Sequence, residues 1–305
     1  MFELVFFGTS ASAPSIQRGL AAEMVLFNEY RFLIDCGEGT QRQILRSGVG
    51  FRRIDRVLLT HGHLDHILGL AGLLSTFSRW ESLDRLEIWG SKHTLDRVQD
   101  LVYRVVFPGA RPPIDLQFHK LQPGVFFEDA DFRVVAFPVT HRGSESFGFR
   151  FEEKERRPFL AEKAEALGVP QGPVRRDLVA GRPITLPGGR LIRPDDVLGD
   201  VIPGTRLAVV GDAGRTDDLI APVRGVDTLV IEATYLEVES DFADEFGHLT
   251  AGRAAALARD AGVGQLILTH VSRRYHEAEI LAEAQAVFPN TVVARDFDHY
   301  KIKRG

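Results

Sequence analysis

The chain opens with short apolar runs separated by polar or glycine-containing turns. Residues 2–7 are apolar apart from Glu3 and are followed by Gly8, and residues 23–27 and 31–34 flank the pair Asn28 and Glu29. Apolar runs of this length, interrupted by turn residues, are typical of β-strands and of a hairpin at residues 28–29. The first half therefore reads as short strands joined by turns.

The same alternation continues along the chain, with helical segments between some strands. Further strands are predicted at residues 56–59, 86–89, 125–128, 132–137, 207–210, 228–231 and 266–268. Helices are predicted to begin within 41–46 and to cover 67–77 and 92–106. Several strands are followed directly by His, Asp or Glu, and polar residues at strand ends converge on one rim of a sheet. We therefore expect an α/β fold with a functional rim.

Residues 152–200 do not show this alternation of strands and helices. They are rich in Pro, Gly, Arg and Glu, and their apolar periodicity is weak. This composition predicts an insertion that projects from one main domain spanning residues 1–305. A disordered surface loop is the alternative, although residues 158–167 and 175–180 contain enough apolar positions for two short helices.

The densest cluster of imidazole and carboxylate side chains follows the apolar run 57–59. Residues 60–66 read Thr-His-Gly-His-Leu-Asp-His, which places three imidazoles and one carboxylate within six positions. Nitrogen and oxygen donors in this arrangement suit zinc or a similar divalent cation. A polar loop with chance histidines is the alternative, but burying several such groups without a partner is costly. The motif therefore favours a metal site.

Enough further donors follow other strands to complete two metal sites. The two candidate sets are His61, His63 and His141, and Asp65, His66 and His270. Asp212 could bridge the two metals with its two carboxylate oxygens. Ions bridged at about 3.5–4 Å stabilise both the attacking and leaving oxygens of a displacement, and they lower the pKa of water. These residues predict a two-metal hydrolase.

The composition bears on the possible partners of the protein and on its cellular compartment. Hydrophobic residues make up 44% of the chain, which is ample for a core, and the formal net charge of -5 gives no support to a nucleic-acid partner outside a local basic patch. Cys36 is the sole cysteine, so a disulfide within the chain is impossible, and we expect a packed side chain. No signal-like N-terminus and no run of about 20 apolar residues is present, which predicts a cytoplasmic protein with no membrane contact.

The motifs together resemble the metallo-β-lactamase fold superfamily and, within it, the ribonuclease Z family of tRNA 3′-processing endonucleases. The matching stretches are 6–11, 33–41, 60–66, 147–150, 172–174, 210–212, 232–234, 248–250 and 268–275. The narrower match rests on the insertion together with Glu232-Ala233-Thr234 and His248-Leu249-Thr250. The resemblance implies a four-layer αβ/βα sandwich with a projecting exosite arm.

The resemblance also implies an activity. The substrate would be a precursor tRNA, cut near the discriminator base to leave a 3′-hydroxyl, by a homodimer with two zinc ions per subunit, with Mn²⁺ or another divalent metal as the alternative. Asp65 would accept a proton and orient the nucleophile, and His248, supported by Glu232, would serve the leaving 3′-oxygen. The insertion 152–200 would be a flexible arm that grips tRNA away from the cut.

Five residues are candidates for RNA contact. Arg175 and Arg176 lie in the insertion, and Arg273, Arg274 and Tyr275 follow His270. The arginines could hold phosphates, which position a substrate without reading its sequence, and Tyr275 could stack on a base.

Two other functions are compatible with parts of this pattern. A small phosphodiester or thioester metallo-hydrolase of the same fold would not need the insertion. A non-catalytic RNA-binding relative would be expected to lose metal ligands, and all seven are present. The endonuclease is therefore the preferred interpretation.

Overall fold

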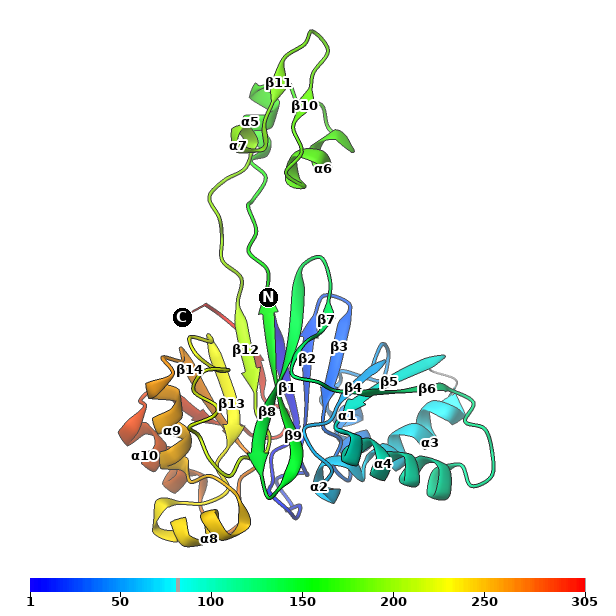
Figure 1. Ribbon diagram of the computed structural model, residues 1–305, viewed down its shortest axis with the longest axis vertical. Coiled ribbons are helices and arrows are strands. Elements are labelled where there is room, and N and C mark those ends of the chain that lie inside the picture. The colour runs from blue at the N-terminus through cyan, green and yellow to red at the C-terminus, as the bar shows by residue number, and fades with distance from the viewer. Residues whose placement is uncertain (81–82, 305) are drawn as a thin grey trace. The chain divides into compact units, whose positions relative to one another are not determined.

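Two mixed β-sheets pack against each other in the main unit, with helices on their outer sides (Figure 1). The structure is a computed structural model that describes residues 1–80 and 83–304. Its main compact unit comprises Met1–Glu152 and Thr205–Gly305, and Glu153–Gly204 forms a second unit. The two units are described separately below.

The first sheet is built from the N-terminal half and the last strand. Its order within the described residues is β16 (His299–Lys301), β1 (Glu3–Gly8), β2 (Ala22–Phe27), β3 (Tyr30–Ile34), β4 (Arg56–Leu58), β5 (Arg85–Gly90) and β6 (Asp115–Lys120). Strands β16 to β3 pair antiparallel, whereas β3 to β6 pair parallel. The parallel part requires crossovers, and these carry the helices of this half.

The second sheet is built from strands that follow β6 in the chain. Its order is β15 (Thr291–Val293), β14 (Gln265–Thr269), β13 (Thr228–Glu232), β12 (Arg206–Val209), β9 (Ser144–Glu153), β8 (Phe132–His141) and β7 (Gly124–Glu128). Strands β12 to β15 are parallel, so the residues that follow β12, β13 and β14 emerge at the same edge.

The helices occupy the outer layers and the rim. They are α1 (Thr40–Ser47), α2 (Leu64–Ile67), α3 (Leu70–Trp80), α4 (Lys92–Asp100), the π-helical turn η1 (Leu101–Val106), the 3₁₀ turn η2 (Glu237–Glu239), α8 (Ser240–Phe246), α9 (Ala251–Asp260) and α10 (Glu277–Val287). Figure 1 shows α3 and α4 beside the first sheet and α9 and α10 beside the second.

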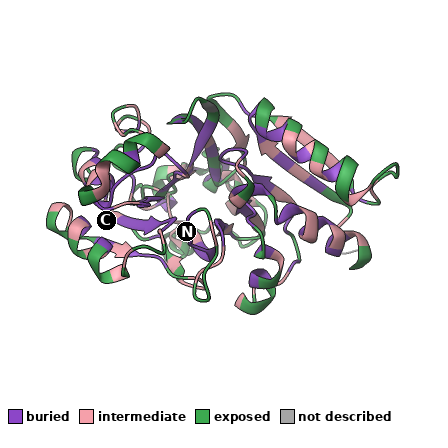
Figure 2. Ribbon diagram, turned by 90° about the horizontal axis from the view of Figure 1, so that it is seen from below, coloured by how far each residue is buried: buried purple, intermediate pink, exposed green. Residues whose placement is uncertain are grey.

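Alternation along β1 shows how one strand serves two cores. Leu4 and Phe6 point into the layer between the sheets, whereas Val5 and Phe7 point into the layer under the helices of the first half. Successive side chains of a strand face opposite sides, so a strand buried on both faces is apolar at every position. Figure 2 shows the buried residues gathered on strands and on the inner sides of helices.

The predicted αβ/βα sandwich is confirmed. Helix 67–77 is observed as α2 and α3, and helix 92–106 is interrupted at residue 101, where η1 begins. Strands β6, β9, β15 and β16 of the main unit were not predicted. Cys36 is fully buried, and burial raises the pKa of its thiol to about 12, which fits the expected packed side chain.

The second unit has its own small core. It contains α5 (Ala161–Ala166), α6 (Val174–Val179), the hairpin β10 (Ile184–Thr185) and β11 (Leu191–Ile192), and α7 (Pro194–Val197). Six buried side chains form its centre: Ala164, Val169, Leu178, Ile184, Ile192 and Val197. The two short helices expected near 158–167 and 175–180 are observed as α5 and α6. The unit runs from Glu153 to Gly204, slightly beyond the predicted 152–200.

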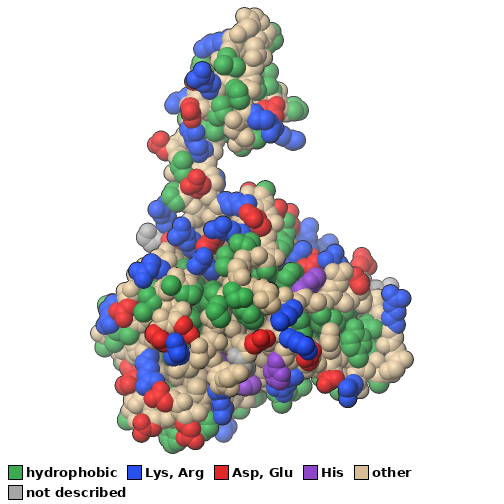
Figure 3. All heavy atoms as spheres, in the orientation of Figure 1, with side chains coloured by type: hydrophobic (Ala, Val, Ile, Leu, Met, Phe, Trp, Pro, Cys, Tyr) green, Lys and Arg blue, Asp and Glu red, His purple; other side chains and the backbone are tan. Residues whose placement is uncertain are grey.

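The outer surface carries charges of both signs. In the view of Figure 3, Lys and Arg side chains are interspersed with Asp and Glu on both units. Among the described residues, no helix is long and apolar enough to cross a membrane.

Candidate metal centre

The predicted ligands meet at one edge of the main unit because each lies at the end of a strand or shortly after it. His61 and His63 come shortly after β4, and Asp65 and His66 lie in α2. His141 is the last residue of β8, Asp212 follows β12, and His270 directly follows β14. The strand ends therefore bring together side chains that are more than 200 residues apart in sequence.

Asp212 faces both halves of this cluster. Its Oδ2 lies 3.6 Å from His61 Nε2 and 3.8 Å from His141 Nε2. Its Oδ1 lies 3.4 Å from both His66 Nε2 and His270 Nε2. One carboxylate oxygen thus points toward each histidine group, which is the arrangement expected of a bridging ligand.

The remaining predicted ligands complete the two groups. His63 Nδ1 lies 3.4 Å from His141 Nε2, and Asp65 Oδ2 lies 3.5 Å from His270 Nε2 and 3.8 Å from His66 Nε2. The donor atoms of His61, His63, His141 and Asp212 lie within 4.8 Å of one another, as do those of Asp65, His66 and His270. Both sets have the composition of a zinc-type site.

Unsatisfied atoms test whether this cluster fits a cation. Nε2 of His61, His66 and His270, together with Oδ1 of Asp212, are buried and find no hydrogen-bond partner within residues 1–80 and 83–304. Buried polar atoms are rarely left unpaired, and four of them converging on one point indicate a missing partner for lone pairs. The residues therefore fit a bound divalent metal.

A second layer of contacts orients the imidazoles. His66 Nδ1 donates to Asp35 Oδ2 at 2.7 Å, and His141 Nδ1 donates to the Gly247 carbonyl at 2.7 Å. These bonds place the proton on Nδ1 and direct the lone pair of Nε2 toward the cluster.

Two threonines act in the same way on the other histidines. Thr60 Oγ1 donates to Asp35 Oδ2 and lies 3.0 Å from His61 Nδ1, so its own oxygen can accept from that imidazole. Thr234 Oγ1 donates to Glu232 Oε2 and lies 3.0 Å from His270 Nδ1. None of Asp35, Thr60, Thr234 and Gly247 had been assigned a role from sequence. Only Asp35, at a strand end before a glycine turn, carried a signal.

The backbone is unusual at two of these positions. Asp35 has φ 55° and His270 has φ 52°, a left-handed conformation that non-glycine residues seldom adopt. Such conformations cluster at functional sites, where the surroundings hold them in place.

The electrostatics of the cluster divide its imidazoles around a charged carboxylate. Burial lowers the pKa of His61 well below its ordinary value and also lowers that of His141. Burial opposes the charge on His66 as well, but Asp212 and Asp35 raise its pKa well above the ordinary value. Burial opposes ionisation of Asp212, but the surrounding imidazoles of His270, His66 and His61 hold its pKa well below the usual range. A neutral imidazole and an ionised carboxylate are the forms that bind metal.

His248 and Glu232 form a separate pair beside the cluster. His248 Nδ1 lies 2.9 Å from Glu232 Oε1, and the Ala213 backbone N–H donates to the same oxygen at 2.7 Å. Burial alone would lower the pKa of His248, but the charge and hydrogen bond of Glu232 raise it to about 9. The His248 ring lies 5.2 Å from that of His141 and 5.6 Å from that of His270. A protonated imidazole is thus held at the edge of the site.

Asp65 has one further contact. The Ser12 backbone N–H donates to Asp65 Oδ2 at 3.0 Å, from the loop that follows β1. Burial alone would raise the pKa of Asp65, but the nearby imidazoles of His270 and His66 hold it well below the usual range. Asp65 is therefore ionised.

Some of the predicted RNA-contact residues are held by contacts within the protein, and others are exposed. Arg274 Nη1 lies 3.1 Å from Glu239 Oε1, and the Tyr275 hydroxyl donates to the same carboxylate, so both are held by internal contacts. Arg175 donates to the Val169 carbonyl inside the second unit. Arg176 and Arg273 are exposed.

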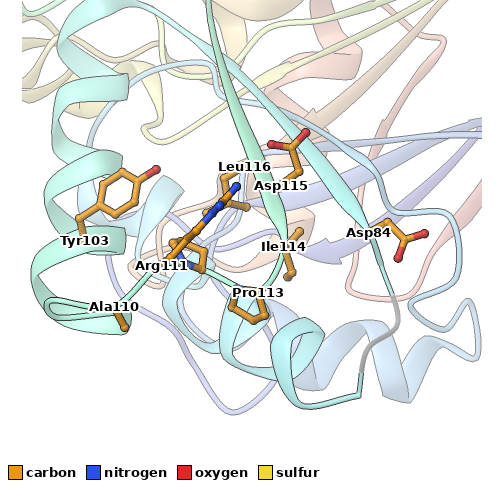
Figure 4. A pocket seen from close by; sticks show the side chains of 9 residues that line it. Asp84, Tyr103, Ala110, Arg111, Pro113, Ile114, Asp115 and Leu116 are labelled. Atoms are coloured by element: carbon orange, nitrogen blue, oxygen red, sulfur yellow. The ribbon is translucent and has the colours of Figure 1, made fainter.

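A cavity elsewhere in the main unit contains none of the predicted ligands. It has a volume of about 750 Å³ and is lined by Asp84, Tyr103 and residues 110–116 (Figure 4). The metal cluster, rather than this cavity, carries the concentration of perturbed and unsatisfied groups that marks a functional site.

Known proteins that are similar to this chain show its superfamily first and then its family. The sequence model of the Beta-lactamase superfamily domain matches residues 30–161 and 177–271, so fold and metal-type cluster define a member of that superfamily. The chain is 50% identical to a ribonuclease Z of Bradyrhizobium sp. (strain ORS 278) over 302 residues, covering 99% of this chain and all of the relative. It is also 50% identical to the ribonuclease Z of Bradyrhizobium diazoefficiens over 299 residues, covering 98% and 99% of the two chains.

A solved structure supports the same family. The short form of human tRNase Z superimposes with a TM-score of 0.69 and 25% identity, covering 99% of each chain. The chain belongs to the ribonuclease Z family.

Proposed function

We propose that this protein is an endoribonuclease that removes 3′ trailers from precursor tRNAs and leaves a 3′-hydroxyl on the tRNA. The observation that carries the proposal is the Asp212 carboxylate, which faces two histidine groups, with the His248–Glu232 pair at its side. Relatives that share half of its residues bear the name ribonuclease Z.

Two divalent cations per subunit, most simply zinc, complete the proposal, and Mn²⁺ is the alternative. His61, His63, His141 and Asp212 would hold one, and Asp65, His66, His270 and Asp212 the other. When bound, such cations polarise a phosphodiester and acidify water.

The side chains of the protein supply the proton transfers. Asp65 is ionised and lies between two imidazoles, so it orients the attacking water and accepts its proton. His248 is protonated at neutral pH and donates to the leaving 3′-oxygen, while Glu232 fixes its orientation. Paired groups with pKa values pushed in opposite directions are the general arrangement for acid–base catalysis.

The second unit supports a role in holding the substrate away from the cut. Strand β9 leaves the metal edge at Ser144, beside His141, and runs ten residues to Glu153, about 30 Å away at strand spacing. Its antiparallel neighbour β12 returns toward Asp212. The insertion is therefore rooted at the far end of the sheet. We propose that it is a flexible tRNA-binding arm in which Arg175 and Arg176 contact phosphates.

This root position also supports a homodimer. An arm rooted far from its own metal edge is suited to a substrate that is cut by a second copy. The compartment that fits a single buried cysteine and a tRNA substrate is the cytoplasm.

Incubation with a trailer-bearing precursor tRNA, followed by mapping of the ends, tests the function. We expect a single cut near the discriminator base, a 3′-hydroxyl on the tRNA, loss of cleavage after chelation and recovery with Zn²⁺ or Mn²⁺. Turnover of small phosphodiesters or thioesters without any tRNA cut would contradict the proposal, as would tRNA binding without cleavage.

A further inference from the structure

Tyr235 lies at the rim of the metal edge, next to His248. The rings of Tyr235 and His248 have centroids 6.1 Å apart and planes inclined by 47°. The backbone of Tyr235 is fixed on both sides, because its N–H donates to the Leu249 carbonyl and its carbonyl accepts from the Ala251 N–H. The ring is therefore held in a defined place beside the proposed proton donor.

This ring is available to a ligand. Tyr235 is only partly buried, and its hydroxyl forms no hydrogen bond with the residues described in the structure. Tyr275, the aromatic residue that sequence favoured, differs: its hydroxyl is bound to Glu239 and its ring packs on the core of the second sheet. Both rings are partly buried, and the difference lies in the hydroxyl, which is bound to the protein in Tyr275 but not, among the described residues, in Tyr235.

The position of Tyr235 next to His248 indicates which part of the substrate the tyrosine ring would contact. Under the proposed function, His248 protonates the 3′-oxygen that leaves, and that oxygen belongs to the last nucleotide retained in the tRNA. A ring beside His248 therefore lies near the ribose and base of this nucleotide. Aromatic rings stack on any base, because every base has a π-face, so this contact suits an enzyme that accepts many tRNAs.

We propose that Tyr235 is a substrate-positioning residue whose ring stacks on the base of the last nucleotide retained in the tRNA. The inference rests on the proposed function and extends it to a contact outside the metal centre. Stacking holds the ribose so that its 3′-oxygen faces His248.

A double-mutant cycle between protein and substrate tests the contact. One precursor tRNA carries its natural nucleotide on the 5′ side of the cut, and a second carries an abasic nucleotide there. For the wild type we expect the abasic change to raise KM about tenfold, the range of one base–aromatic stack. Tyr235→Ala should raise KM about tenfold with the natural substrate and show no further loss with the abasic one. Tyr235→Phe should behave as the wild type.

Controls separate this contact from a structural role. Tyr235→Ala should retain its metal content and turn over bis(p-nitrophenyl) phosphate within twofold of the wild type. Tyr103→Ala removes an exposed tyrosine on η1, away from the metal centre, and should leave both KM values unchanged. An equal loss on the small phosphodiester, or a full abasic penalty in Tyr235→Ala, would overturn the inference. A wild type that binds metal but does not cut the natural precursor would instead refute the proposed function itself.

Discussion

Glu232 and His248 are joined by a carboxylate–imidazole contact of 2.9 Å in the interior of the protein. Glu232 has no exposed surface, and it also accepts from the Ala213 backbone and from Thr234. The carboxylate is thus fixed from three sides, and the charge on the imidazole depends on it. This dependence leads to a prediction about pH.

Glu232→Gln should shift the pH dependence of cleavage. Glu232 raises the pKa of His248 to about 9, so the acid form persists through neutral pH and is lost only as the pH rises through that value. Without the negative charge, the pKa should fall toward its ordinary value near 6.5. The variant should then lose about 25-fold in kcat between pH 6 and pH 8, whereas the wild type changes little. Matching pH profiles for the two proteins would show that His248 is not the acid.

Asp65→Ala should abolish precursor cleavage while tRNA affinity stays within a few-fold. Asp65 is the ionised acceptor between His66 and His270, and its removal eliminates the proposed proton acceptor and one metal ligand. Cleavage is followed on end-labelled precursor, and binding is measured by filter retention. Asp96→Asn, which changes an exposed carboxylate paired with Lys92, serves as the matched control. Activity comparable to that of the wild type would remove Asp65 from the mechanism.

Asp35→Asn should weaken metal binding without removing a ligand. Asp35 accepts from His66 Nδ1 and from Thr60, so it sets the tautomer of one ligand and holds the loop that bears the others. Partners of this kind are typically worth ten- to a hundredfold in metal affinity. Competition with a zinc-responsive dye measures the effect directly, with Asp96→Asn again as control. Unchanged zinc affinity would mean that His66 is oriented by packing alone.

The ligands and their supporting contacts differ in how far sequence reveals them. His141, Asp212 and His270 could be proposed because each follows an apolar run, and strand ends converge on one edge. Thr60 and Thr234 could not, because their roles depend on rotamers and on which strands become neighbours. Tyr235 gave no signal for the same reason: its position beside His248 arises from the bridge between residues 235 and 250.

The secondary structure shows the same contrast. Strand β9 was missed although Phe147, Phe149 and Phe151 alternate with Gly148, Arg150 and Glu152, a period of two that is typical of a strand. The four residues of α2 are too few to produce a helical period. The edge strand β6 is only partly buried, so its apolar alternation is weak.

Glu23 should make stability depend on pH. It is 8% exposed on β2, and burial together with the charge of Asp35 raises its pKa to about 8. The folded state therefore binds a proton that the unfolded state releases near pH 4.5. The free energy of unfolding should fall as pH rises from about 4.5 to 8, by up to about 1.4 kcal/mol per pH unit.

The neutral variant Glu23→Gln should lack this component. Urea unfolding of chelator-treated protein at pH 5.5, 6.5 and 7.5 should show the variant gaining stability relative to the wild type at each step. Glu29→Gln, at an exposed turn, should track the wild type. Parallel curves for all three proteins would place the titration of Glu23 in its ordinary range.

Removal of the second unit should separate tRNA cleavage from hydrolysis of small substrates. The two ends of the unit meet closely, because a Cβ on Gly204 would lie 1.9 Å from the Glu153 carbonyl oxygen, and Glu152 pairs with Arg206. An Asn-Gly turn between Glu153 and Gly204 should therefore close β9 and β12 as a hairpin without disturbing the main unit. The core of the second unit is its own, so the three cores of the main unit remain intact.

The shortened protein should keep its metal and turn over bis(p-nitrophenyl) phosphate within a few-fold of the full chain. Its precursor tRNA cleavage should fall far more, mainly through KM, because phosphate contacts supply binding rather than chemistry. Its tRNA binding should also depend less steeply on salt, since fewer phosphates are neutralised. Arg175→Gln with Arg176→Gln in the full chain should reproduce part of the loss and of the change in salt slope. Equal losses on both substrates would show that the second unit supports the metal centre rather than the tRNA.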